Sequence, residues 1–202
     1  MKMGFGIAAL GGLILTGCTA DYAKQNDSNV LLLLVSLSAN AGAGPDKGTN
    51  SAFLISDVST NGSVVNDNGS ATFAVRPKNP SPGGTPVTPN AEDVVLEQYS
   101  VSYTRTDGHN VEGVDVPYSF SSSLPSTLIA VGTSSTSVGF IIVRHSAKSE
   151  PPLSRLVGFG SDAILSMNIN LTFYGHTVSG QAVSVAGSIP VTFADFVDTT
   201  SS

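Results

Sequence analysis

The chain of 202 residues contains no Trp and a single Cys. One cysteine excludes an intrachain disulfide. It also excludes a cysteine-cluster zinc site, an iron–sulfur cluster and a covalently attached c-type haem, all of which draw on several cysteines. A folded domain in this chain must therefore be stabilised by packing and hydrogen bonds, without covalent cross-links.

Charge is scarce as well: Asp, Glu, Lys and Arg make up 12% of the chain, which is about half the usual fraction. Nine basic residues stand against fifteen acidic ones, for a net charge of −6, and the basic residues form no cluster. Phosphate contacts supply most of the affinity in nucleic-acid binding. The chain is therefore a poor nucleic-acid binder and a poor electrostatic partner for anionic lipids.

Sequence motifs of catalysis are missing too. The chain shows no P-loop, dinucleotide fingerprint, His-Glu-x-x-His or Gly-x-Ser-x-Gly. Its three histidines, His109, His145 and His176, stand at no metal-ligand spacing. We interpret each as a solvated or locally hydrogen-bonded residue of a loop or strand end, and we predict no catalytic residue, no metal and no cofactor.

Short segments rich in β-branched residues, separated by turn residues, fill most of the chain, and no helix of three turns is visible. This pattern predicts an all-β fold, a single antiparallel β-sandwich of about 8–10 strands. The strand pattern resembles the immunoglobulin-like or fibronectin-like domains of bacterial surface proteins. The Cys…Trp…Cys marker of true immunoglobulin domains is absent.

The clearest strand signal lies near the C-terminus. Leu165–Phe173 alternates apolar and polar residues in strict phase, and Val183–Phe193 is the expected returning strand. We predict that the two form an antiparallel hairpin across a turn at Gly175–Gly180. Pro190 has no N–H to donate, which predicts that at least this end lies at a sheet edge.

Two more segments, Val30–Leu37 and Val138–Arg144, are apolar throughout and are predicted as strands buried on both faces. Asp67-Asn68-Gly69 predicts a hairpin turn. Further strand candidates are Ala52–Val58, Ser70–Lys78, Val94–Thr106, Val114–Phe120 and Ser126–Val131. The alternating residues of the third candidate, expected in phase on one face, are Val95, Tyr99, Val101 and Tyr103.

The N-terminus carries the most specific motif. A positive start, Met1–Lys2, precedes the apolar run Gly4–Leu15, which is too short for a membrane-spanning helix of about 20 residues. Leu15-Thr16-Gly17-Cys18 follows directly. This order resembles the lipobox of bacterial lipoproteins, whose Cys sulfur receives a diacylglyceryl group before a peptidase cuts in front of it. An ordinary secretory peptide and an uncleaved anchor are the alternatives.

The resemblance implies lipidation at Cys18 and a mature protein that starts there. We expect a signal peptide over 1–17, a lipidated tether over 18–29, the sandwich over 30–197 and a polar tail over 198–202. Two or more acyl chains anchor a protein stably, so the partner implied first is a membrane. Thr19 stands where an Asp would favour inner-membrane retention. This favours a cell-envelope location at the outer membrane over the inner one.

Three functions stay open at this stage. The first is a non-catalytic binding or structural module for another envelope or surface protein, with Asn79–Asn90 and Thr106–Asp115 as contact loops. The second is an envelope hydrolase that uses dispersed carboxylates or a His, although Glu92-Asp93 and Glu97 are expected to be a solvated rim. The third is a receptor for calcium or a small ligand.

Calcium is considered because oxygen-bearing side chains gather in two predicted turns. Turn formation explains the same residues equally well. The two groups are Asn66, Asp67 and Asn68, and Asp107, Asn110, Glu112 and Asp115. Tyr99 and Tyr103 share a face and are expected in the core or at a sheet edge, with a carbohydrate or peptide platform as the alternative.

Overall fold

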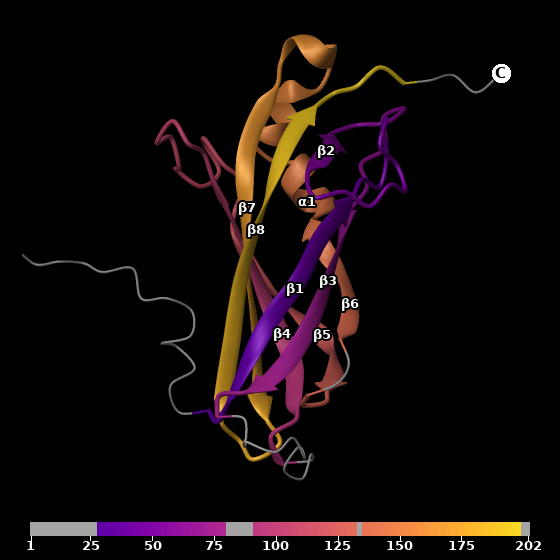
Figure 1. Cartoon of the computed structure of the whole chain (residues 1–202). Helices are drawn as coiled ribbons and strands as arrows, with labels where there is room; N and C mark the ends of the chain where they lie inside the picture. The colour runs from indigo at the N-terminus through magenta and orange to yellow at the C-terminus, as the bar shows by residue number, and fades with distance from the viewer. Residues whose placement is uncertain (1–27, 80–90, 133–134, 199–202) are drawn as a thin grey trace, which may run out of the picture.

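A computed structural model describes residues 28–79, 91–132 and 135–198. Within these residues the chain forms eight strands in two sheets, which confirms the all-β sandwich (Figure 1). The three-stranded sheet has the order β1-β3-β6 and the five-stranded sheet the order β2-β8-β7-β4-β5. The strands are β1 (Val30–Asn40), β2 (Leu54–Asp57), β3 (Asp67–Pro77), β4 (Val94–Thr104), β5 (Phe120–Ile129), β6 (Thr136–Val143), β7 (Leu165–Thr177) and β8 (Ala182–Ala194). Between β6 and β7 lie α1 (His145–Lys148), η3 (Leu153–Leu156) and η4 (Gly160–Asp162).

The strand order is similar to that of an immunoglobulin sandwich, although no described strand takes the place of D. Strands β1, β3 and β6 take the places of A, B and E, and β4, β7 and β8 those of C, F and G. Strand β5 extends the second sheet beyond β4. Strand β2 crosses between the sheets and pairs parallel to β8, with Leu54 opposite Val191, whereas the other strand pairs are antiparallel.

Four aromatic rings fill the middle of the sandwich, and we call them the aromatic centre. Phe73 of β3 meets Phe173 of β7 edge-to-face at 4.8 Å between ring centroids. Tyr99 of β4 lies 5.2 Å from Phe140 and 6.3 Å from Phe173. Antibody domains join strands B and F by a disulfide and pack a Trp of strand C on it. Here the same three strands contribute Phe73, Phe173 and Tyr99.

The predicted C-terminal hairpin is confirmed. Strands β7 and β8 pair from Leu165–Phe193 to His176–Ala182. The in-phase residues Met167, Ile169, Leu171 and Phe173 are buried. The expectation for Pro190 holds only in part: β8 is a sheet edge up to Pro190, and β2 covers the edge from Val191 onward.

Strands β1 and β6 were expected to be buried on both faces, and this is wrong for β1 and for most of β6, where Gly139 is exposed and Ile141 half-buried; it holds at Ile142 and Val143. Both are edge strands that flank β3. Leu33 and Val35 of β1 are 40% and 58% exposed. The long apolar run of β1 has another cause, because its side chains also reach β8. A Cβ atom on Gly187 would come within 2.4 Å of Leu34 Cδ2, which shows how closely β1 approaches β8.

The hairpin turn predicted at Asp67-Asn68-Gly69 is also wrong, since these residues begin β3. The turn lies earlier, where Thr60 and Ser63 pair and Asn61 and Gly62 have φ of 50° and 74°. Gly69 serves packing instead. A Cβ atom there would lie 2.4 Å from the ring of Phe140.

The expected phase of β4 is broken by a bulge between Leu96 and Gln98. Val94 and Leu96 therefore face the core together with Tyr99, whereas Val95 is only half-buried. The strand predicted over 114–120 does not form. Val116 makes an isolated bridge to Glu112, and β5 begins at Phe120 and also includes the predicted segment from Ser126.

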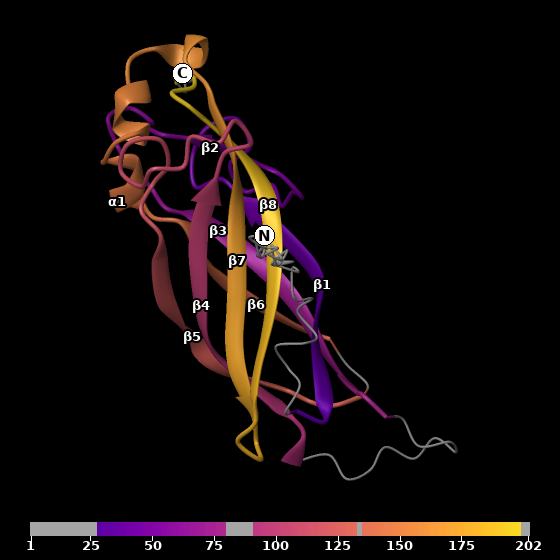
Figure 2. The same ribbon diagram turned by 90° about the vertical axis from the view of Figure 1, so that its left-hand side faces the viewer.

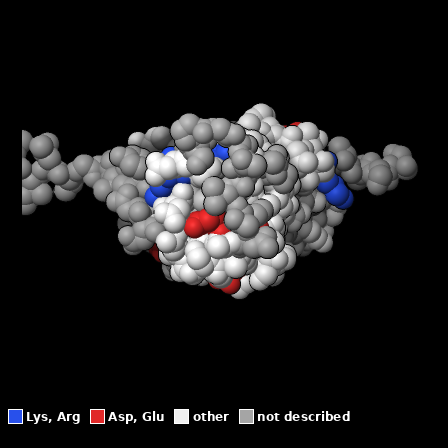
Figure 3. Space-filling model, turned by 60° about the horizontal axis from the view of Figure 1, so that its bottom comes forward, with Lys and Arg blue, Asp and Glu red and all other residues white. Residues whose placement is uncertain are grey.

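The two ends of the sandwich carry different parts of the chain (Figure 1). Strand β1 starts at the lower end, where the Lys78 N–H donates to the Asn29 carbonyl at 2.9 Å. The Asn29 amide also donates to Glu92 at 3.2 Å, so both sides of the segment 80–90 meet this N-terminal end. Loops 105–119 and 144–164 lie at the opposite, far end (Figure 2). Seen with the N-terminal end forward, the described surface shows acidic atoms near the middle of the view and basic atoms to its left and right (Figure 3).

Among the described helices, none has the length and apolar character that crossing a membrane would require.

Candidate binding face

The outer face of the five-stranded sheet carries uncharged polar side chains over most of its length, and we call it the hydroxyl face. It spans β4, β7 and β8, which lie side by side in Figure 2. Its residues are Ser, Thr and Asn with one Tyr, one Ala and one Pro: Ser100, Ser102, Thr104, Ser166, Asn168, Asn170, Thr172, Tyr174, Ser184, Ala186, Ser188, Pro190 and Thr192. None of these side chains is charged.

Strand geometry explains why these residues share a face. Successive side chains of a strand point to opposite sides, so burial of Ile169 and Leu171 places Asn170 outside. Cross-strand hydrogen bonds then order the outer side chains. The Asn170 amide donates to the Thr104 hydroxyl at 2.9 Å. On the other side of β7, the Ser166 and Thr192 hydroxyls lie 3.2 Å apart.

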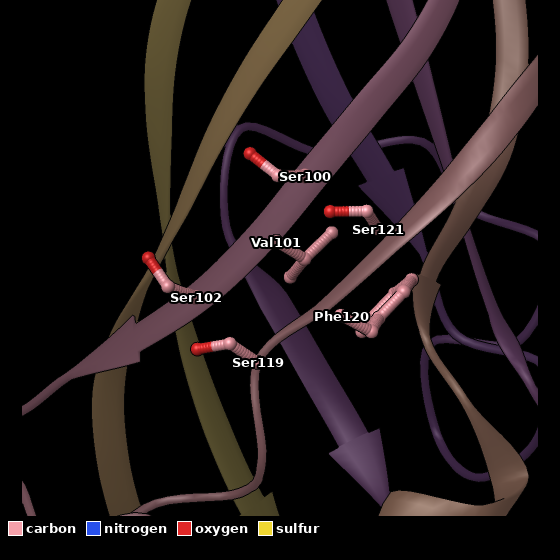
Figure 4. A pocket seen from close by; sticks show the side chains of 6 residues that line it. All are labelled: Ser100, Val101, Ser102, Ser119, Phe120 and Ser121. Carbon is pink, nitrogen blue, oxygen red and sulfur yellow. The ribbon is translucent and has the colours of Figure 1, made fainter.

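A shallow hollow of ≈ 410 Å³ lies on this face between β4 and β5. It is lined by Ser100, Val101, Ser102, Ser119, Phe120 and Ser121. The four serine hydroxyls point to one side, and the side chains of Val101 and Phe120 point to the other (Figure 4).

Packing on the inner side of the sheet holds β5 in place beside the hollow. The Phe120 ring lies 6.1 Å from the Tyr99 ring, and the Arg144 guanidinium lies 4.1 Å from the Phe120 centroid on a cation–π contact. Contacts on two sides restrict the ring, and with it the β5 backbone that borders the hollow.

An aromatic side chain borders the hollow. Tyr174 is 43% exposed, and its hydroxyl lies 3.4 Å from that of Ser100. Charged groups stand only at the margins of the hydroxyl face. Glu112 accepts hydrogen bonds from the backbone N–H and the hydroxyl of Ser119. At the N-terminal end of the face, His176 pairs with Glu97 at 3.4 Å.

The structure does not assemble the three histidines into a site. His109 lies in the loop 105–119, His145 begins α1 with Nδ1 3.1 Å from the Asn66 side-chain oxygen, and His176 meets Glu97. Across residues 28–79, 91–132 and 135–198, no three His, Cys, Asp or Glu side chains are grouped as metal ligands would be.

The first group considered for calcium was Asn66, Asp67 and Asn68. Asp67 of this group belongs instead to a buried ion pair with Lys148, which we call the ionic centre. Asp67 Oδ1 lies 2.9 Å from Lys148 Nζ, and neither side chain has any exposure. Asp67 also accepts from the Ser56 hydroxyl at 2.6 Å and from the Gly42 N–H at 3.0 Å. Lys148 donates a second bond to the Asp57 carbonyl at 2.8 Å.

The second group considered for calcium, Asp107, Asn110, Glu112 and Asp115, forms hydrogen bonds within the loop 105–119. A hydrogen bond from Arg105 lowers the pKa of Asp107, with a smaller lowering contribution from the His109 N–H. Asp115 accepts from the Val111 N–H at 3.1 Å. Elsewhere, the expectation that Asp93 belongs to a solvated rim is wrong, because Asp93 is 5% exposed and accepts from the Val131 N–H at 2.9 Å.

Tyr99 and Tyr103 belong to the core, which confirms the expectation for this pair. Their hydroxyls donate to the carbonyls of Ile141 at 2.9 Å and Ile142 at 3.3 Å. The exposed aromatic residue of the hydroxyl face is Tyr174, on the opposite side of the same sheet. The uncharged character of the face around Tyr174 could be read from the sequence, because the polar residues of Leu165–Phe173 include no Lys, Glu or Asp.

Cys18 and residues 80–90 lie outside the described residues. Thr106–Asp115 forms much of the loop 105–119 at the far end, away from both sides of the segment 80–90. The described flanks of the first predicted contact loop and the second predicted contact loop therefore lie at opposite ends of the sandwich. Comparison of the chain with family models, with curated protein sequences and with solved structures finds no match.

Proposed function

We propose that this chain is a lipid-anchored envelope protein that works as a non-catalytic binding module and uses the hydroxyl face as its binding surface. The observation that supports the proposal is an ordered, uncharged polar face that spans three strands and borders a hollow between β4 and β5. The lipid anchor rests on Leu15-Thr16-Gly17-Cys18, and the outer membrane on Thr19.

The free energy of desolvation favours binding on this face. Solvent-facing protein surfaces usually hold about 25–35% Lys, Arg, Glu and Asp, which bind water strongly. Removing water from a hydroxyl or an amide costs far less than removing it from a charge, provided that a hydrogen bond replaces the water. The sheet also holds these groups in place before binding, so little conformational entropy is lost.

The position of the face suits an anchored protein. Strand β1 begins at the N-terminal end, so a tether over 18–29 would hold that end nearest the lipid. The hydroxyl face then runs along the side of the sandwich, and exposed apolar residues such as Phe159 and Val111 lie at the far end. Anchoring raises the local concentration of the binding face at the membrane.

The anchor is tested by metabolic labelling of the full-length chain in a bacterium with a radioactive fatty acid. Wild type should take up the label and partition with membranes, and Cys18→Ala should do neither. Labelling of Cys18→Ala would contradict the anchor.

The binding surface is tested by cross-linking in cells. A charge placed on the face, Ser102→Asp or Thr172→Asp, should abolish a cross-link that wild type forms. Ser137→Asp, on the exposed side of β6 in the other sheet, is the matched control and should keep it. The proposal fails if the purified chain hydrolyses a glycan, ester or peptide and this activity is lost on replacement of Glu112, Glu97 or His176.

A further inference from the structure

We infer that the hydroxyl face binds a neutral polysaccharide, with one sugar ring stacked on Tyr174 and a neighbouring sugar in the hollow between β4 and β5. The inference rests on the proposed binding function and names its ligand class.

Charge determines the first property of the ligand. A polyanion would require Lys or Arg on the face, and a cation would require Asp or Glu there, yet its side chains are uncharged. The acidic groups at the margins are already engaged, Glu112 by Ser119 and Glu97 by His176. The complementary ligand is therefore one without formal charge.

Hydrogen-bonding capacity determines the second property. A Ser or Thr hydroxyl both donates and accepts, and an Asn side chain does the same through its two ends. Sugar hydroxyls have this dual capacity too, so a carbohydrate can satisfy a face of mixed donors and acceptors. A protein partner would need a buried apolar or aromatic anchor at the centre of its interface. The apolar contacts among the residues of this face are Tyr174 on β7 and the small side chains of Ala186 and Pro190 on β8, so the face has a single aromatic residue and no apolar cluster around it.

Geometry determines the third property. The hydroxyls of Tyr174 and Ser100 are 3.4 Å apart, so the exposed ring and the hollow form one continuous surface. Adjacent strands lie about 4.8 Å apart, so the hydroxyls of β5, β4 and β7 present parallel rows to an extended ligand. A volume of ≈ 410 Å³ lies within the range of small-ligand sites, about 300–1,000 Å³, but the hollow is open to solvent. An open hollow suits an internal unit of a chain that continues on both sides.

The test is titration of the full chain, purified in detergent, with cellohexaose, maltohexaose, xylohexaose and dextran, and with oligogalacturonate as the charged comparison. At least one neutral glycan should bind, and oligogalacturonate should not. Tyr174→Ala should weaken binding about tenfold, the effect of losing roughly 1.4 kcal/mol of stacking. Ser102→Asp should weaken it at least as much.

Two matched variants serve as controls. Phe159→Ala removes an aromatic side chain that is 62% exposed at the far end, and Ser137→Asp adds a charge to the other sheet. Both should bind as wild type does. Thermal unfolding of each variant verifies that it is folded, and Thr172→Asp replaces Ser102→Asp if the latter is not.

The inference is overturned if none of the neutral glycans binds at millimolar concentration, or if Tyr174→Ala binds as tightly as wild type. The proposed function has a separate outcome. If no glycan binds but Ser102→Asp and Thr172→Asp lose a cross-link to a cellular protein, the binding face stands and the polysaccharide is wrong. If these variants lose neither glycan nor cross-link, both proposals fail.

Discussion

The aromatic centre and the ionic centre are both buried, but they stabilise the sandwich by different physical means. In the aromatic centre, Phe73 and Phe173 make edge-to-face contact between the two sheets, and no ring atom there needs a hydrogen-bond partner. In the ionic centre, Lys148 and Asp67 have no solvent exposure and depend on bonds to each other and to Ser56, Gly42 and Asp57.

The aromatic centre contributes mainly to the free energy of folding, whereas the ionic centre contributes mainly to the specificity of the arrangement. Burial of aromatic surface stabilises many arrangements of similar volume, so the aromatic centre fixes the distance between the sheets more than their connection. A buried ion pair yields little net free energy after desolvation, but it is stable only with its bonds in place. The ionic centre joins β3, β2 and α1, so it specifies where β2 crosses between the sheets.

The largest effect is expected from breaking the ion pair on one side. Lys148→Met leaves the Asp67 carboxylate buried without its cation, and we expect a loss of about 3–5 kcal/mol in the free energy of unfolding. Urea unfolding of the purified chain measures it. The double variant Lys148→Met/Asp67→Leu should recover most of the loss, because it removes both charges. Equal stability of Lys148→Met and wild type would show that the pair contributes only through packing.

Truncation next to the aromatic centre should have a comparable or smaller effect. Ile169 is fully buried in β7, and Ile169→Ala should cost about 2–5 kcal/mol through lost contacts and a cavity. Its neighbour Asn168 faces the other side, and Asn168→Ala should change stability by about 0.5 kcal/mol or less. Equal losses at the two positions would contradict the register of β7.

Adding one methyl group tests how closely the aromatic centre is packed. Gly69→Ala places a Cβ atom 2.4 Å from the Phe140 ring, and we expect a loss of about 1–3 kcal/mol from overpacking. Gly139→Ala on β6 is the control, because its Cβ atom would meet nothing closer than the Gly69 carbonyl at 3.9 Å. A neutral Gly69→Ala would show that the Phe140 ring can move aside at little cost and that the aromatic centre is not closely packed there.

The smallest effect concerns Tyr103, which lies between the two centres. Burial raises its pKa in the folded protein, so the hydroxyl stays neutral where an unfolded chain ionises. Stability should therefore be unaffected below pH 10 and fall above about pH 10, by at most about 1.4 kcal/mol per pH unit for this group. Tyr103→Phe should reduce that slope while losing the same amount, about 1 kcal/mol, at pH 7 and pH 9. An unchanged alkaline slope in Tyr103→Phe would assign it to other groups.

Local sequence pattern predicted the fold class and the β7–β8 hairpin because alternation alone determines which side chains of a strand are buried. It failed at Asp67-Asn68-Gly69, whose residue types fit a turn. Their roles depend on Lys148 and Phe140, which are distant in sequence. It failed for the phase of β4 because a bulge adds one residue without any local signal.

Only part of the candidate face could be predicted from the sequence. The uncharged residues between Leu165 and Phe173 could be read directly, but their alignment with Ser100 and Ser121 depends on the register of three strands. The hollow and its contact with Tyr174 follow from that register, and no single segment predicts them.

The contact between Phe73 of β3 and Phe173 of β7 also removes the need for a disulfide bond between these two strands. Immunoglobulin domains that rely on a disulfide between these strands need an oxidant to mature and lose stability in a reducing compartment. Phe73 and Phe173 make the corresponding contact without electron transfer. Cys18, the only thiol of the chain, has no second cysteine with which to form a wrong pairing. Folding of the sandwich therefore requires no oxidant, and no disulfide competes for the Cys18 sulfur that we propose as the site of lipidation.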